Sequence, residues 1–232
     1  GVPQSALAAQ GHYQSCGPLG SCGIMPGMPT TGGRPDIGLL PLWDLYWLQT
    51  QSAQAAAYAM AQADAAGSIP WHVEQSPGVP VQVNSNQSGF WADDRCSAWN
   101  SPCSPMSYSA AENGSGIQPD TAHQPELAYT AYLLTGQHYY LDELAAQAGY
   151  SETASSPYYI RTANGTVKSG DLVVGENQQL RASAWSVREL MLAALAEPDG
   201  SALQSYFAKA TTDNMAYTAT LAGNPAKGQL IG

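Results

Sequence analysis

The stretch that decides the fold is residues 125–149, which read PELAYTAYLLTGQHYYLDELAAQAG. Proline is favoured at the first position of a helix, and glycine is favoured just after the last one. The pattern breaks at 135–137, so we predict two helices, over 125–135 and 138–148, that form an αα-hairpin. Apolar residues recur at helical spacing along both helices, at Leu127, Ala131, Leu134, Leu141 and Leu144.

The same pattern occurs on both sides of this stretch. Helices are predicted over 41–50 and 53–66 before it, and over 178–196 and 201–215 after it. A small β-hairpin is predicted near 158–168, because Asn164-Gly165 is a strong signal for a two-residue turn. The sequence therefore predicts a mainly α protein of repeated αα-hairpins with long loops between them.

The composition excludes several classes of protein. The chain has 232 residues, a formal net charge of −10 and only 11% charged residues. Binding to nucleic acid needs a basic surface that releases counterions, so we expect no nucleic-acid partner. A membrane helix needs about 18 consecutive apolar residues, and none occur. No phosphate-loop, dinucleotide or metal-ligand pattern stands in its required context, so we expect neither cofactor nor metal.

Four cysteines form two local pairs, Cys16 with Cys22 and Cys96 with Cys103. Each pair closes a short loop that contains Gly, Pro or Ser. A zinc site, the rival interpretation, would need closer cysteine spacing or nearby histidines. We expect two disulfides, which persist in oxidising compartments, and therefore an extracellular or periplasmic protein.

The chain divides by composition into three parts. They are an irregular N-terminal segment with a local disulfide (1–38), a helical-hairpin domain (39–223) and a tail (224–232). Within the domain the hairpins span about 41–66, 125–149 and 178–215. The chain begins at Gly1 without an initiator Met, which indicates either a removed leader or a piece of a longer polypeptide.

A polar cluster stands at the start of each outgoing helix. The clusters read GRPDIG at 33–38, HQPELAY at 123–129 and QQLRASAWSVR at 178–188. Over roughly residues 30 to 215, the hairpins and these clusters resemble the α/α-toroid carbohydrate-active enzymes. These are barrels of repeated helical hairpins that include many glycoside hydrolases and polysaccharide lyases. Such toroids commonly hold more than the three hairpins found here, which favours a piece of a longer chain.

The resemblance implies a secreted enzyme that acts on a polysaccharide or oligosaccharide, with a glycoside hydrolase ranked slightly ahead of a lyase. A hydrolase needs two carboxyl groups about 5–10 Å apart. A lyase needs a base, a proton donor and a group that neutralises a uronate. The low charge and the few hairpins favour the alternative, a non-catalytic extracellular structural, surface or assembly module that associates with itself or with the rest of a longer chain.

Four residues are candidates for catalysis. His123, beside Asp120 and Glu126, is the candidate general base or orienting group. Asp36 and Glu126 are the candidate catalytic carboxyl groups, and Tyr129 is a candidate proton donor for a lyase. The alternatives are packing at a helix start for His123 and a capping role for Asp36.

The candidates for substrate binding carry amides, guanidinium groups or aromatic faces, which suit sugar hydroxyls, carboxylates and rings. They are Arg34, Gln124, Gln179, Arg181, Trp91 and Trp99. The alternative for Arg181 is a pair with Glu176 or Glu189, and Arg188 is a weaker candidate on the same helix face. Each cluster has the same place in its hairpin, so we expect the clusters to converge in one cleft, with the loop that holds Trp91 and Trp99 over it. The converging residues would be Arg34, Asp36, His123, Gln124, Gln179 and Arg181.

Overall fold

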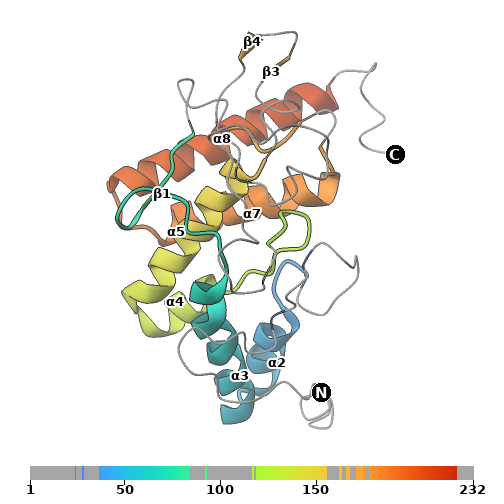
Figure 1. Ribbon diagram of the computed structural model, residues 1–232. Helices are drawn as coiled ribbons and strands as arrows, with labels where there is room; N and C mark the ends of the chain where they lie inside the picture. The colour runs from blue at the N-terminus through green and yellow to red at the C-terminus, as the bar shows by residue number, and fades with distance from the viewer. Residues whose placement is uncertain are drawn as a thin grey trace.

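The fold was examined in a computed structural model (Figure 1). The structure describes residues 37–83, 119–155, 171–175 and 178–223, the strand residues 162–163 and 166–167, and the single residues Ile24, Met28, Ala92 and Ile117.

The described residues are mainly helical, as the sequence predicts. They form six α-helices and a 3-10 turn, which are α2 (Leu42–Thr50), α3 (Ala53–Asp64), η2 (Ala65–Ser68), α4 (Tyr129–Thr135), α5 (His138–Thr153), α7 (Leu180–Ala196) and α8 (Ala202–Ala222). Helices that are neighbours in sequence pack as pairs, α2 with α3, α4 with α5, and α7 with α8.

The helix breaks follow local chemistry. Gly136 closes α4 in the left-handed conformation with φ of 66°, where glycine pays no steric penalty. Gln51 closes α2 in the same conformation with φ of 51°, although it is not glycine. Ser52 and Ser201 start α3 and α8, and each side chain accepts a hydrogen bond from the backbone N–H three residues on.

The predicted start of α4 was wrong. The helix begins at Tyr129 instead of 125, because the carboxylate of Glu126 reaches forward along the chain and accepts the backbone N–H of Tyr129. That contact satisfies an amide at the helix start that has no partner within the helix. The ends of α5 and α8 lie further along the chain than predicted, at Thr153 and Ala222.

Two small antiparallel hairpins accompany the helices. The predicted one is confirmed as β3 (Thr162–Ala163) and β4 (Thr166–Val167), with Thr162 opposite Val167. The other joins β1 (Glu74–Ser76) to β2 (Val79–Pro80) through Pro77-Gly78, and the sequence analysis missed it. Gly78 has φ of 72°, so this turn does contain a recognisable glycine signal.

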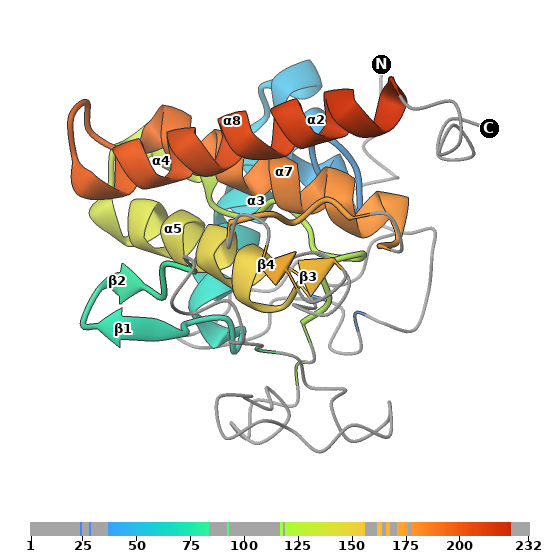
Figure 2. The ribbon, with the colours of Figure 1, turned by 90° about the horizontal axis from the view of Figure 1, so that it is seen from above.

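Helix α5 is the centre of the described structure. Thirteen of its sixteen residues are buried, and it contributes to both hydrophobic clusters. Ala146, Tyr150 and Ala154, at the end of the helix, face the first cluster with α2 and α3. Leu141, Leu144 and their neighbours face the second cluster with α7 and α8. Figure 2 shows α7 lying between α5 and α8, with the β1–β2 hairpin beside α5.

No helix among the described residues is both long enough and apolar enough to cross a lipid bilayer.

Candidate functional site

The structure brings Asp120, His123 and Arg181 together. Nδ1 of His123 contacts Oδ2 of Asp120 closely, and Nε2 of the same ring lies 2.7 Å from Nη2 of Arg181. A guanidinium group can only donate, so Nε2 must accept and the imidazole is neutral at that nitrogen. The ring proton is therefore on Nδ1 and is donated to Asp120, which fixes both the tautomer and the orientation of the ring.

Two local structures position this group. Residues 121–123 form a turn in which the backbone N–H of His123 donates to the Asp120 carbonyl over 3.1 Å, so that both side chains project together. Arg181 lies in the first turn of α7 and is half-buried. Asp120 and His123 are 3% and 7% exposed, so Arg181 is the member of the group that solvent reaches most easily.

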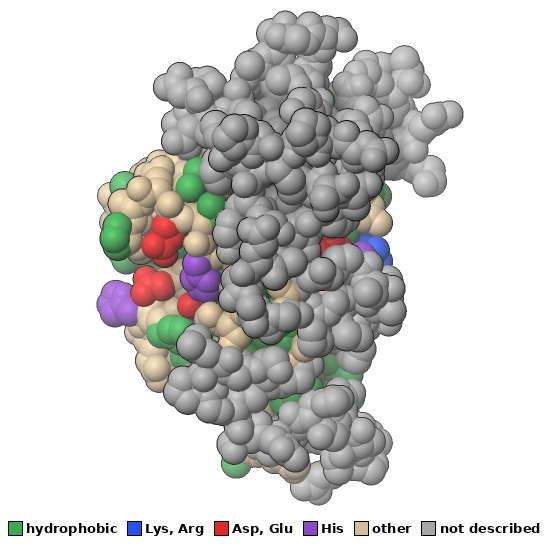
Figure 3. Space-filling view, in the orientation of Figure 1, with side chains coloured by type: hydrophobic (Ala, Val, Ile, Leu, Met, Phe, Trp, Pro, Cys, Tyr) green, Lys and Arg blue, Asp and Glu red, His purple; other side chains and the backbone are tan. Residues whose placement is uncertain are grey.

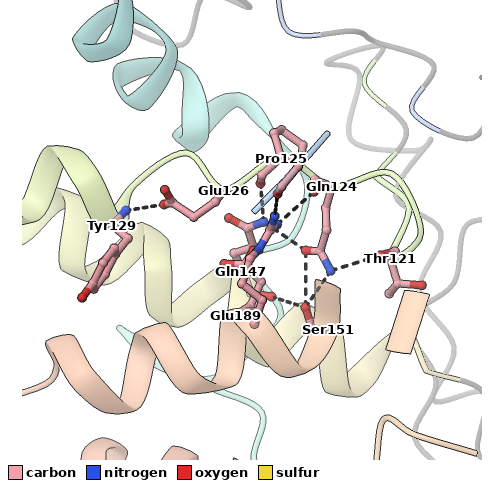
Figure 4. A network of polar contacts seen from close by, with 10 residues as sticks. Thr121, Gln124, Pro125, Glu126, Tyr129, Gln147, Ser151 and Glu189 are labelled. Carbon is pink, nitrogen blue, oxygen red and sulfur yellow. Dashed lines mark hydrogen bonds and ion pairs between the residues drawn. The ribbon is translucent and has the colours of Figure 1, made fainter. Parts of the chain in front are cut away.

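Gln124, the next residue, belongs to a buried polar network instead of a surface (Figure 4). Its amide nitrogen donates to Oγ of Ser151 over 3.0 Å, and its amide oxygen accepts from Nε2 of Gln147 over 3.0 Å. Gln147 also donates to the Pro125 carbonyl over 2.7 Å. These contacts tie the segment that carries His123 to α5, and they supply the polar partners that buried amides require.

Arg188, two turns after Arg181, is buried beneath the same segment. It donates to the Gln124 carbonyl over 3.0 Å and closely contacts the Gly38 carbonyl. It also pairs with Glu189, its neighbour in sequence, and its guanidinium lies 4.8 Å from the centre of the Trp185 ring. Arg188 therefore has a structural role that joins α7 to two loops.

Three buried carboxyl groups lie in this region, namely Asp44 from α2, Glu126 from the segment before α4, and Glu189 from α7. Glu189 pairs with Arg188, Glu126 lies near both of them, and Asp44 lies near Glu126. Burial, with the charge of Glu126 nearby, raises the pKa of Asp44 to about 8. Burial raises the pKa of Glu189 to about 7 even though Arg188 opposes the shift. Burial also raises the pKa of Glu126, against the backbone amides of α4 and the charge of Arg188.

The remaining candidates fall into two groups. Gln179 is exposed at the position before α7 and caps no amide with its side chain. Tyr129 is half-buried and packs against the second hydrophobic cluster, and Figure 4 shows its side chain pointing away from Gln124. The candidates that lie outside the described residues are Arg34, Asp36, Trp91, Trp99, Glu176 and the four cysteines Cys16, Cys22, Cys96 and Cys103.

A pocket is lined by residues that are neighbours of Arg181 in sequence. Leu180 and Ser183 line it from α7, while Thr218 and Leu221 line it from α8, and its lining is mainly apolar. Such a surface suits an apolar group better than the hydroxyls of a sugar.

Acidic and histidine side chains gather on another face, where α5 begins (Figure 3). His72 pairs with Glu143 over 2.8 Å, and the charges of His138 and Glu197 lie close to Asp142. Within the described ranges, no three His, Cys, Asp or Glu side chains are arranged to hold a metal ion.

The sequence analysis missed Asp44 and Glu189 as buried acids, although a signal existed. Glu189 falls in the same helical stripe as Ala182, Ser186 and Ala193, all of which are buried. An acid at such a position points into the interior unless the helix is rotated.

Comparisons with protein-family models, with curated proteins and with solved structures gave no match to this chain. The likeness to α/α-toroid enzymes rests on the hairpins and polar clusters of the chain alone.

Proposed function

We propose that the protein is a secreted carbohydrate-active enzyme whose three helical hairpins form part of an α/α toroid. We further propose that it cleaves uronate-containing polysaccharides by β-elimination. The observation that carries this proposal is the contact of a neutral His123, oriented by Asp120, with the half-buried guanidinium of Arg181. The group combines a base with a cation that suits a uronate carboxylate.

The placement of the carboxyl groups favours elimination over hydrolysis. A hydrolase requires two carboxyl groups that reach opposite sides of one glycosidic bond. Asp120 is buried against His123, and Glu126 is fully buried against the start of α4. Both carboxyl groups are therefore already engaged within the protein, whereas the guanidinium of Arg181 is half-buried at the start of α7.

The reaction begins when substrate breaks the contact between His123 and Arg181. A uronate carboxylate competes for Arg181, so Nε2 of His123 loses the hydrogen bond from the guanidinium and can act as a base. Nε2 then removes the proton at C5, a double bond forms between C4 and C5, and the bond from C4 to the bridging oxygen breaks. The imidazolium returns the proton to the departing oxygen, and Asp120 stabilises the positive ring meanwhile.

The test is an ultraviolet assay for the unsaturated product, with uronate and neutral polysaccharides as substrates. His123→Ala should lower kcat about 10²- to 10⁴-fold, the usual contribution of a general base. Arg181→Gln should raise KM for uronate substrates, because it removes the guanidinium that would bind the carboxylate of the substrate. The control is Lys209→Gln, which removes the same charge from a side chain that is 64% exposed on α8.

Each other outcome has a defined meaning. Binding of a uronate polysaccharide without product in the wild type would contradict catalysis and favour the non-catalytic extracellular module. Equal activity of the His123 variant and the Lys209 variant would show that His123 is not the base.

A further inference from the structure

We propose that Asp44, Glu126, Glu189 and Arg188 form a buried cluster that holds two protons and joins α2, the segment before α4, and α7. The cluster stabilises the fold less as pH rises. The cluster stands on geometry that the proposed function does not use, and the inference does not depend on that function.

The first step is the balance of charge in the cluster. Asp44 is 3% exposed, and both glutamates are fully buried, as is nearly all of Arg188. Three ionised carboxyl groups against one guanidinium would place two uncompensated negative charges in the interior. Isolated buried charges are very unfavourable, and such groups bind protons instead. The cluster becomes neutral when it holds two protons.

The second step is the hydrogen bonding. Within the described part of the chain, one oxygen of each acid is buried without a hydrogen-bond partner, namely Oδ2 of Asp44, Oε2 of Glu126 and Oε2 of Glu189. An ionised carboxylate would need partners at both oxygens, whereas a protonated one presents a neutral O–H at one of them. Three such oxygens in one cluster favour the protonated form.

The third step decides which acid keeps its charge. The carboxylate of Glu126 accepts the backbone N–H of Tyr129, and the nearby amides of α4 and Arg188 favour its ionised form. Among the described residues, the charge that acts on Asp44 is that of Glu126 and not a cation, and Glu189 lies near Glu126 as well as Arg188. We therefore assign the two protons to Asp44 and Glu189. The other side chain that contacts Asp44, among those that the structure describes, is the uncharged Thr130 from α4.

The sign of the pH effect follows. Both acids ionise near their ordinary pKa when the chain unfolds, but they keep their protons to about pH 8 and about pH 7 in the folded state. The folded state therefore holds two more protons than the unfolded state, and stability falls as pH rises. The equilibrium constant for unfolding should rise about 100-fold per pH unit between about pH 5 and pH 7 from this cluster alone.

The test is the pH dependence of denaturant unfolding for Asp44→Asn and Glu189→Gln. Each amide keeps the shape of the protonated acid, so each variant should make the dependence about tenfold less steep per pH unit. Asp142, Asp171 and Glu197 also have raised pKa values, and they contribute equally to the pH dependence of unfolding in every variant. The test is therefore the difference in pH dependence between variants. The control is Asp199→Asn, a carboxyl exposed between α7 and α8, which should leave the steepness unchanged.

A second measurement covers variants that fail to fold. The infrared spectrum of the wild-type protein at pH 6 should show the carbonyl band of protonated carboxyl groups. Absence of that band, or a pH dependence in both amide variants equal to that of Asp199→Asn, would overturn the proposal.

Discussion

At the scale of the residue, the two arginines of α7 illustrate how position within one helix separates a structural role from a functional one. They are seven residues apart and share a face, so both are candidates for binding a ligand from the sequence alone, with Arg188 the weaker one. Arg181 is half-buried against His123, whereas Arg188 is 4% exposed and bonds to two loop carbonyls. The difference arises from the loops that cover them, which periodicity does not reveal.

This contrast gives a matched pair of variants. Arg188→Met should destabilise the protein by about 3–5 kcal/mol, because it removes the cation from a buried acid cluster and leaves two carbonyls without their donor. Arg181→Met, the same change on the same helix, should cost about 1 kcal/mol or less, since Arg181 is half-buried and its contact with His123 lies within reach of solvent. Unfolding in guanidinium chloride measures both, and equal losses would contradict the assignment of roles.

The buried acids show why part of the site could not be predicted from sequence. His123 and Arg181 were found because they stand at helix starts, where repetition places equivalent residues together. Glu189 was treated only as a partner for an arginine, and Asp44 was not singled out. Their importance depends on three segments meeting at one point, α2, α4 and α7, and that meeting is a property of tertiary packing.

At the scale of the element, the close approach of β2 to α5 depends on one glycine. A Cβ atom built on Gly149 would lie 2.5 Å from Cβ of Pro80, closer than real side chains approach. Gly149→Ala should therefore destabilise the protein by about 1–3 kcal/mol, although alanine is the better helix former.

A double-mutant cycle separates the clash from helix propensity. In a Pro80→Gly background the obstructing side chain is gone, and Gly149→Ala should become neutral or stabilise the protein by up to about 1 kcal/mol. Thermal unfolding of the four proteins provides the measurement. A loss of equal size in both backgrounds would mean that the contact with Pro80 is not the cause.

Helix boundaries were predictable where a capping residue starts or ends the helix by its own local effect. Gly136, Ser52 and Ser201 mark ends that were placed within one or two residues, because each effect comes from the residue itself. The start of α4 was missed because Pro125 suits a helix start equally well in sequence, while Glu126 caps the helix three residues before Tyr129 in the fold. The β1–β2 hairpin was missed because its strands have three and two residues, too short for an alternating pattern.

At the scale of the whole molecule, a mainly helical fold could be predicted from the sequence, because three separate segments each show the same αα-hairpin pattern. The central position of α5 could not, since Gln147, Ser151 and Glu152 are buried although nothing in the helical pattern marks these polar residues as buried. Their partners come from distant segments, as when Tyr206 of α8 donates to Glu152 over 2.5 Å. A sequence pattern shows that a residue is polar, but the packing decides whether its partner is water or protein.

The compartment in which the protein works is the last property that the composition predicts. Cys16 and Cys22 enclose five residues, and Cys96 and Cys103 enclose six, so each pair should close a short local loop as a disulfide. Mass spectrometry of the unreduced protein should show each peptide pair linked and two hydrogens lighter per link than after reduction. Loops this short constrain the unfolded chain modestly, so reduction should cost about 2–3 kcal/mol per link. Free thiols in protein purified from an oxidising compartment, or zinc released on denaturation, would instead show that the cysteines are reduced or metal-bound, and the proposal of secretion would lose its chemical basis.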